Sequence, residues 1–259
     1  MSLNIFTKSE KKTLYRFEEI DIIRGLAIVI MIFAHIFWDL DHFGLYSLNS
    51  SIYGFFARVV PFVFFLIVGV SLIISYKKKP LHPDQEKKYY RHLFFRGLKI
   101  IVFGMILSFF SFIFVPDKPV YFGVLHCIGL SIILCIPFLK VKKFNLFFSL
   151  PTIIFGCLIN QINFQNPNLL LFVMGFQPDH VFHYTVDYFP ILPWFGVVLL
   201  GMVIGDFIYC GNKRRFRFPD LSVYKPAKLF SWCGKHSLGL YLLHQPVIGG
   251  LLYLFTISV

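Results

Sequence analysis

Charged side chains are scarce in this sequence. Asp, Glu, Lys and Arg together make up only 15% of the 259 residues, whereas they make up about 25% of an average soluble domain. No polar stretch between the apolar runs is long enough to fold as a domain of its own. The composition therefore excludes an ordinary soluble protein, and we expect a single membrane domain over residues 1–259.

Several motifs that carry chemistry are missing. The sequence has no HExxH zinc motif, no Walker loop and no GxSxG nucleophile elbow. Its five cysteines form no CxxC pair and lie in or beside apolar runs, as small buried residues do. We therefore expect no metal cofactor. A His/His/Asp metal site assembled from several helices stays open, because ligand spacing cannot be read when each ligand comes from a different helix.

Apolar residues, by contrast, dominate the chain. They make up 57% of it, with 34 phenylalanines, and the mean hydropathy is +0.70. Seven runs come close to the roughly 20 apolar residues that a bilayer crossing requires. These predicted spans cover about residues 20–40, 52–76, 93–115, 121–139, 144–160, 188–209 and 229–255. The expected fold class is an all-α polytopic membrane protein, a bundle of about seven transmembrane helices.

The basic residues predict the orientation of this bundle. The net charge is +12, and in the seven-span arrangement every Lys and Arg except Arg58 and Lys118 falls on one side. Because cytoplasmic loops carry the excess of Lys and Arg, the N-terminus is expected in the cytoplasm, with residues 1–19 as a polar segment. That segment is not followed by a small-residue cleavage site, so the first span is expected to stay as an anchor in the cell membrane. Topology explains the basic clusters without a nucleic-acid partner.

The first span carries ionisable residues, which are costly inside a bilayer and usually face a protein interior and a function. Ten residues separate Arg24 from His35, so a helix brings both back to nearly the same face. Asp39 and His42 follow His35 by four and seven residues on that face. A carboxylate beside an imidazole is the usual arrangement for a general base, so His35, Asp39 and His42 are the predicted catalytic residues.

The remaining ionisable residues fall into two layers. His35 lies roughly 22 Å from the inner end of its span, and His126 and His244 reach a similar level from other spans. The outer layer contains His126, Asp187 and His244, and we expect it, together with Trp194, to bind the substrate. The inner layer is basic and suits an anionic ligand such as a phosphorylated cofactor. Its predicted cofactor-binding residues are Arg24, Arg96, Lys99, Lys228 and His236.

Each of these residues also has an ordinary structural interpretation. Arg24 can pair with Asp21, and a buried histidine can satisfy a hydrogen bond between helices. The loop lysines and arginines can reflect topology alone. The segment from Asp187 to Trp194 contains two prolines at the mouth of a span, which fits either a cavity lining or a plain helix start.

Five blocks of the sequence, in order, resemble a known family. They are IDIIRGLAIVIMIFAHIFWDL in the first span, PFVFFLIVGVSLIIS in the second, YFGVLHCIGLSIIL in the fourth, DYFPILPWFGVVLLGMVIG in the sixth and GKHSLGLYLLHQPV in the seventh. Together they are similar to the heparan-α-glucosaminide N-acetyltransferase catalytic-domain family of transmembrane acyltransferases. The spacing of Arg24 and His35 also resembles a hallmark pair of the wider acyltransferase-3 group.

The resemblance implies transfer of an acyl group, typically acetyl, from cytosolic acyl-CoA to an amine or hydroxyl of a sugar-like acceptor on the outer side. It implies that the CoA phosphates meet the inner basic layer and that the acceptor arrives at the outer histidine layer. His35 would then remove the acceptor's proton as the acceptor attacks the thioester. The expected partners are acyl-CoA, a carbohydrate or amino-sugar acceptor and the lipid bilayer, and a homodimer is left open.

One departure from the family keeps alternatives open. Animal members place the catalytic histidine further along, in the first luminal segment, where the histidine of this sequence is His42. The base is therefore left between His35 and His42, and the mechanism between direct transfer and an acyl-histidine intermediate. Heparan sulfate is not the expected acceptor, because the animal enzyme's large luminal region has no counterpart here. The alternative outside the enzymes is a transporter or lipid-handling protein that uses the same polar residues as a path.

Overall fold

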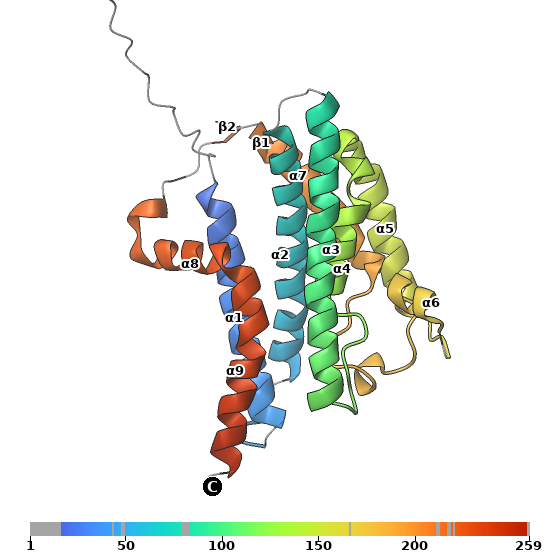
Figure 1. The fold of residues 1–259 in the computed structure, drawn as a ribbon, viewed down its shortest axis with the longest axis vertical. Coiled ribbons are helices and arrows are strands. Elements are labelled where there is room, and N and C mark those ends of the chain that lie inside the picture. Colours follow the sequence, from blue (N-terminus) through green and yellow to red (C-terminus); the bar gives the residue numbers. More distant parts are fainter. Residues whose placement is uncertain are drawn as a thin grey trace, which may run out of the picture.

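The chain is almost entirely helical in a computed structural model. The structure describes residues 17–42, 44–47, 50–78, 83–165, 167–210, 213–216, 219 and 221–257. Its helices are α1 (Glu18–His42), α2 (Ser50–Lys77), α3 (Pro83–Phe114), α4 (Val124–Leu134), α5 (Asn145–Ile159), α6 (Leu169–Met174), α7 (Ile191–Ile208), α8 (Lys225–Lys235) and α9 (Ser237–Ile257), and Figure 1 shows their arrangement. A two-stranded hairpin, β1 (Tyr209–Cys210) with β2 (Lys213–Arg214), follows α7.

The expected class, an all-α membrane protein, is confirmed. Within the described residues, five helices are long and apolar enough to cross a membrane, namely α1, α2, α3, α7 and a segment over 142–159 that contains α5. The count of seven spans and the cytoplasmic N-terminus stay predictions.

Two expected spans differ from the structure. The run over 121–139 contains α4, which has only 11 residues and ends before Pro137. Proline has no backbone N–H and cannot continue the helix, so the chain goes on as a 3-10 turn. The run expected over 229–255 is two helices, α8 and α9, separated at His236. Figure 1 shows α8 lying across α1, whereas α9 runs alongside it.

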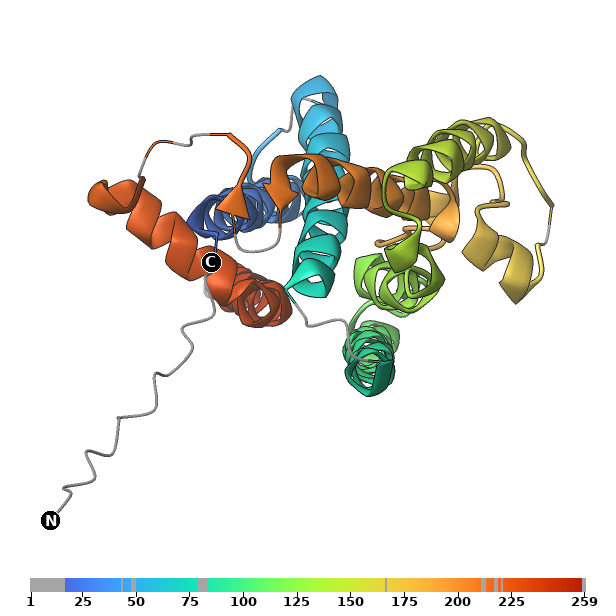
Figure 2. The ribbon, with the colours of Figure 1, turned by 90° about the horizontal axis from the view of Figure 1, so that it is seen from above.

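The helices form a row when seen along the bundle. Viewed from above in Figure 2, α8, α9 and α1 lie at one side, α2 and α7 in the middle, and α4, α5 and α6 at the other side. The residue contacts agree, because α1 packs on α2, α8 and α9, α2 packs on α7, and α7 packs on α5. The long helix α3 packs on α4. The main core lies between α2 and α7 and includes the fully buried Phe65, Leu72, Leu199 and Met202.

The crossing of α1 and α8 is a contact between two backbones. A Cβ atom on Gly25 would lie 1.8 Å from the carbonyl oxygen of Phe230, and one on Gly234 would lie 1.8 Å from the carbonyl oxygen of Asp21. Such distances are impossible for real side chains, so both positions require glycine. The pair fixes α8 against the first turns of α1.

Candidate functional site

Two predicted site residues meet where α1 contacts α9. We call this contact, around His35, Asp39, His244 and Gln245, the seam between α1 and α9. The ring centroids of His35 on α1 and His244 on α9 are 4.9 Å apart. The sequence places both at a similar depth but does not say that their helices are neighbours. The structure adds that contact, so His35 belongs to a histidine pair and is not a single histidine.

The hydrogen bonding of His244 fixes its tautomer. Its Nδ1 lies 2.6 Å from the backbone carbonyl oxygen of Tyr241. A carbonyl oxygen only accepts hydrogen bonds, so Nδ1 must carry the proton. In the neutral ring, Nε2 then carries the lone pair, and this buried atom has no hydrogen-bond partner among the described residues. His244 therefore holds a proton-accepting nitrogen that no described protein group satisfies.

Next to this pair, Asp39 contacts a residue that sequence reasoning missed. Asp39 is only 3% exposed, and its two carboxylate oxygens accept hydrogen bonds from Nε2 of Gln245 at 3.1 and 3.2 Å. Gln245 directly follows His244, so one turn of α9 supplies both the second imidazole and a partner for the carboxylate. The sequence signal for Gln245 is its place directly after His244 in the block GKHSLGLYLLHQPV. The oxygen Oε1 of Gln245 is also buried without a partner among the described residues.

Two tyrosines connect this seam with Asp187, which precedes α7. Tyr53 on α2 lies within electrostatic range of both Asp39 and Asp187, and Tyr241 on α9 lies within range of Asp187. Tyr241 packs both against the main core between α2 and α7 and against a smaller apolar cluster that includes Ile28 and Met31 of α1. The ring centroid of Tyr241 is also 5.5 Å from that of His244, so Tyr241 lies near both of the predicted substrate-binding residues His244 and Asp187.

Asp187 and His126 also share a structural task at the start of α4. Oδ2 of Asp187 accepts a hydrogen bond from the Val124 N–H at 3.2 Å, and Nδ1 of His126 accepts one from the Gly123 N–H at 3.2 Å. These bonds satisfy amides at the open end of a helix. Desolvation raises the pKa of Asp187 to about 6, although the bond from Val124 opposes the increase. His126 stacks on Phe122 at 5.5 Å, and no described contact joins it to His35.

Trp194 lies in the packed interior near the start of α7. Its indole stacks on Phe65 of α2 with centroids 5.0 Å apart and contacts Phe189 at 5.2 Å. The helix begins irregularly, because Leu192 has a non-helical backbone (φ −97°, ψ 124°). The two prolines thus distort the mouth of this helix as the sequence suggests, but the contacts of Trp194 are those of a core residue.

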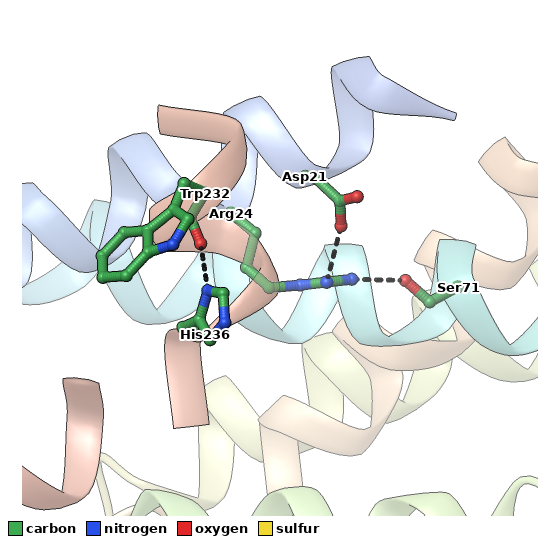
Figure 3. A network of polar contacts seen from close by, with 5 residues as sticks. All are labelled: Asp21, Arg24, Ser71, Trp232 and His236. Carbon is green, nitrogen blue, oxygen red and sulfur yellow. Dashed lines mark hydrogen bonds and ion pairs between the residues drawn. The ribbon is translucent and has the colours of Figure 1, made fainter. Parts of the chain in front are cut away.

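At the other end of α1, Arg24 lies between two helices. Figure 3 shows its guanidinium reaching Asp21 at 3.2 Å and the hydroxyl of Ser71 on α2 at 2.9 Å. The same view shows Trp232 and His236 at the end of α8, where Nδ1 of His236 lies 2.9 Å from the carbonyl oxygen of Trp232. The pairing of Arg24 with Asp21 that the sequence allowed is present. The contact with Ser71 adds a connection to α2.

The predicted basic layer is spread over separate parts of the bundle. Arg96 and Lys99 are exposed on α3, which packs on α4. Lys228 is on α8 and lines a small cavity beside α1. Arg24, Lys228 and His236 therefore belong to the α1–α8 crossing, whereas Arg96 and Lys99 do not.

Two further sequence expectations concern His42 and metal binding. His42 is the last residue of α1, and its side chain lies outside the described part of the structure. Among the other histidines, His183 is exposed and stacks on His180 at 5.2 Å. Within the described ranges, no group of three His, Cys, Asp or Glu residues is arranged to hold a metal ion.

A comparison with protein families identifies the type of chain. The family model for the catalytic part of heparan-alpha-glucosaminide N-acetyltransferase matches residues 16–246. This range begins before α1 and ends just after Gln245, so it contains His35, Asp39, His244 and Gln245. Neither the curated proteins nor the solved structures give a match. Because the family model covers most of the sequence, the chain belongs to the heparan-alpha-glucosaminide N-acetyltransferase catalytic-domain family.

Proposed function

We propose that this protein is a CoA-dependent transmembrane acyltransferase whose reaction takes place at the seam between α1 and α9. The family indicates an acetyltransferase in the membrane. The observation that supports the location is the pair of His35 and His244, with a buried, unpartnered ring nitrogen on His244. The acceptor is an amine or hydroxyl of a sugar-like molecule on the outer side.

The pair supplies the base for acyl transfer. A ring nitrogen of the pair takes the proton from the acceptor, while the acceptor's oxygen or nitrogen forms a bond to the thioester carbonyl carbon. The carbon–sulfur bond then breaks, and CoA leaves as the thiolate, which takes up a proton. His244 is suited to carry the positive charge because its Nδ1 donates to the Tyr241 carbonyl. General base catalysis of this kind is worth roughly 10²–10⁴-fold in rate.

A second mechanism, through an acyl-histidine intermediate, uses the same nitrogen and is proposed beside the first. A histidine with a free lone pair can attack the thioester directly and form an acyl-histidine, which the acceptor then resolves. Both mechanisms require an unprotonated ring nitrogen at the seam. Asp39 and Gln245 position the middle of α9 in either case, since their hydrogen bonds join α1 to the residue that follows His244.

The donor approaches from the Arg24 end of α1. Arginine binds phosphate by charge and by paired hydrogen bonds, and Arg24 lies at the crossing of α1 and α8 close to His236. Along α1, the rise from Arg24 to His35 is about 16 Å. A donor whose phosphates bind near Arg24 would have to extend its thioester arm along this helix. The orientation that puts Arg24 on the cytoplasmic side, with seven spans, is part of the proposal.

The test is transfer by the purified protein. Incubation with acetyl-CoA and glucosamine should release free CoA, which a thiol reagent measures, and should yield an acetylated sugar. His35→Ala should abolish transfer while CoA binding is retained, and His183→Ala, at an exposed histidine outside the seam, should leave the rate unchanged. Failure to bind CoA at millimolar concentration would contradict the proposal and favour a transporter. Full turnover by His35→Ala would move the base to His244 or His42.

A further inference from the structure

A small cavity lies where α8 crosses the beginning of α1, away from the histidine seam. Its volume is about 140 Å³. The residues that line it are Glu18, Ile22, Ala227, Lys228, Ser231 and Lys235. The Gly25–Gly234 contact fixes the two walls relative to each other, so the cavity is built into the crossing.

The cavity offers groups of both charges. Lys228 and Lys235 are exposed on α8, and neither forms an ion pair with any residue that the structure describes. Glu18 faces them from the first turn of α1. Glu18 also lies within electrostatic range of Arg214, but that arginine is already paired with Glu19 at 2.7 Å. Two cations and one anion therefore surround the same space.

A buried serine supplies the second, independent observation. Ser231 is only 6% exposed, and its hydroxyl oxygen has no hydrogen-bond partner in the described part of the chain. A buried hydroxyl left without a partner costs free energy comparable to a lost hydrogen bond. The hydroxyl belongs to a cavity-lining residue between Lys228 and Lys235 on one face of α8. A ligand oxygen would satisfy it.

The cavity lies beside the first turns of α1, where a candidate membrane span begins. Glu18 and Ile22 belong to the first turns of α1, at the level where a membrane-crossing helix meets the headgroups. Leu26, one turn further on the same face as Ile22, is 43% exposed, and Trp232 on α8 is 53% exposed. Tryptophan at this depth is typical of the membrane interface. An apolar surface therefore continues from the charged cavity into the span.

We propose that this cavity binds the headgroup of a zwitterionic phospholipid that carries a phosphate and a primary ammonium group. The phosphate oxygens bind Lys228, Lys235 and the Ser231 hydroxyl, and the ammonium binds Glu18. An acyl chain continues along Leu26 of α1. The Glu18 carboxylate favours a zwitterionic headgroup over a purely anionic one, because a purely anionic headgroup would place its negative charge beside Glu18.

The test is lipid binding by the delipidated, full-length protein in detergent, measured by native mass spectrometry. Phosphatidylethanolamine should bind more tightly than phosphatidylglycerol at equal concentration. Lys228→Gln combined with Lys235→Gln should weaken phosphatidylethanolamine binding about tenfold or more, as the loss of a charge-assisted hydrogen bond predicts. Ser231→Ala should weaken it less. Lys225→Gln, at an exposed lysine of the same helix outside the cavity, is the matched control and should bind as the unmodified protein does.

Glu18→Gln separates the proposed class from its alternatives. This variant should lose the preference for phosphatidylethanolamine over phosphatidylglycerol while retaining binding to both. Equal binding of the two lipids to the unmodified protein would overturn the proposal, as would lysine variants that bind like the control. Displacement of the lipid by millimolar CoA would also overturn it, because the cavity would then be a site for the donor's phosphates. None of these outcomes depends on whether the protein transfers acetyl groups.

Discussion

His35 on α1 and His244 on α9 lie with their ring centroids 4.9 Å apart, and the hydrogen bond from His244 Nδ1 to the Tyr241 carbonyl leaves Nε2 as the nitrogen with the lone pair. His244→Asn tests the role of that nitrogen, since the asparagine amide can still donate to the carbonyl. We expect acetyl transfer to fall by roughly 10²–10⁴-fold with little change in CoA binding. The measurement is the rate of CoA release. A rate within threefold of that of His183→Asn would exclude Nε2 from the reaction.

The bond between Asp39 and Gln245 should contribute to stability as well as to position. Gln245→Ala removes the donor from both carboxylate oxygens of a residue that is 3% exposed. We expect a loss of about 1–3 kcal/mol in the free energy of unfolding, seen as a lower thermal midpoint in detergent. Gln245→Glu should destabilise the protein further at neutral pH, because two carboxylates would face each other. An unchanged midpoint in both variants would contradict this role.

The backbone contact at Gly234 predicts a large effect from the smallest substitution. A Cβ atom there would meet the Asp21 carbonyl at 1.8 Å, so Gly234→Ala must push α8 away from α1. We expect a loss of about 1–3 kcal/mol or more, as in other overpacked contacts. Gly239→Ala is the control, since a Cβ atom at Gly239 of α9 meets no atom within 4 Å. Thermal unfolding should distinguish the two variants, and equal midpoints would show that the crossing is looser than described.

Asp187 predicts a pH dependence of stability. Its pKa in the folded protein is about 6, above the ordinary value near 3.8 that it has in the unfolded chain. The folded protein therefore binds the proton more tightly, so this carboxyl favours folding at low pH. The contribution falls as the pH rises from about 4 through 6, by about 1–3 kcal/mol in total. Asp187→Asn should make the thermal midpoint less dependent on pH over this range, and an unchanged pH profile would contradict the assignment.

The orientation of the bundle can be tested with exposed lysines. Lys77 is unsuitable, because its amino group is held at 2.8 Å from Asp206 and at 2.7 Å from the Tyr209 carbonyl. Lys87 and Lys118 are both exposed, and the positive-inside rule places them on opposite sides. In intact cells, an impermeant amine reagent should modify Lys118 and leave Lys87 unmodified. In lysed cells it should modify both. Labelling of Lys87 in intact cells would reverse the predicted topology.

The sequence predicted those features that depend on one helix at a time. The periodicity of the first span placed Arg24, His35 and Asp39 on one face, and the structure uses that face to contact α2 and α9. Which helices would be neighbours could not be read, because apolar spans carry no signal that pairs them. For that reason the partners Ser71 and Gln245 were missed.

The ends of the spans were less predictable than their existence. Hydropathy averaged over residues 229–255 concealed a change of direction at His236, because the exposed Leu229 and Trp232 of α8 resemble lipid-facing residues. The tight crossing at Gly25 and Gly234 is a tertiary contact, and a single sequence shows only two ordinary glycines. The sequence predicts His126 at a depth similar to that of the other histidines, but it does not reveal the bond that His126 makes at the start of α4, where its Nδ1 accepts from the Gly123 N–H.

The glycine crossing has a consequence for the geometry of the histidine pair. Only His236 separates α8 from α9. The contact at Gly25 and Gly234 that fixes α8 on α1 therefore also fixes the position at which α9 begins. His244 follows that point by two helical turns, about 11 Å along the axis. The register of the two imidazoles is thus set at the α1–α8 crossing, by a contact between backbone atoms. A displacement of α8 at that end would therefore also move His244 relative to His35. The added methyl group of Gly234→Ala would be enough to cause such a displacement.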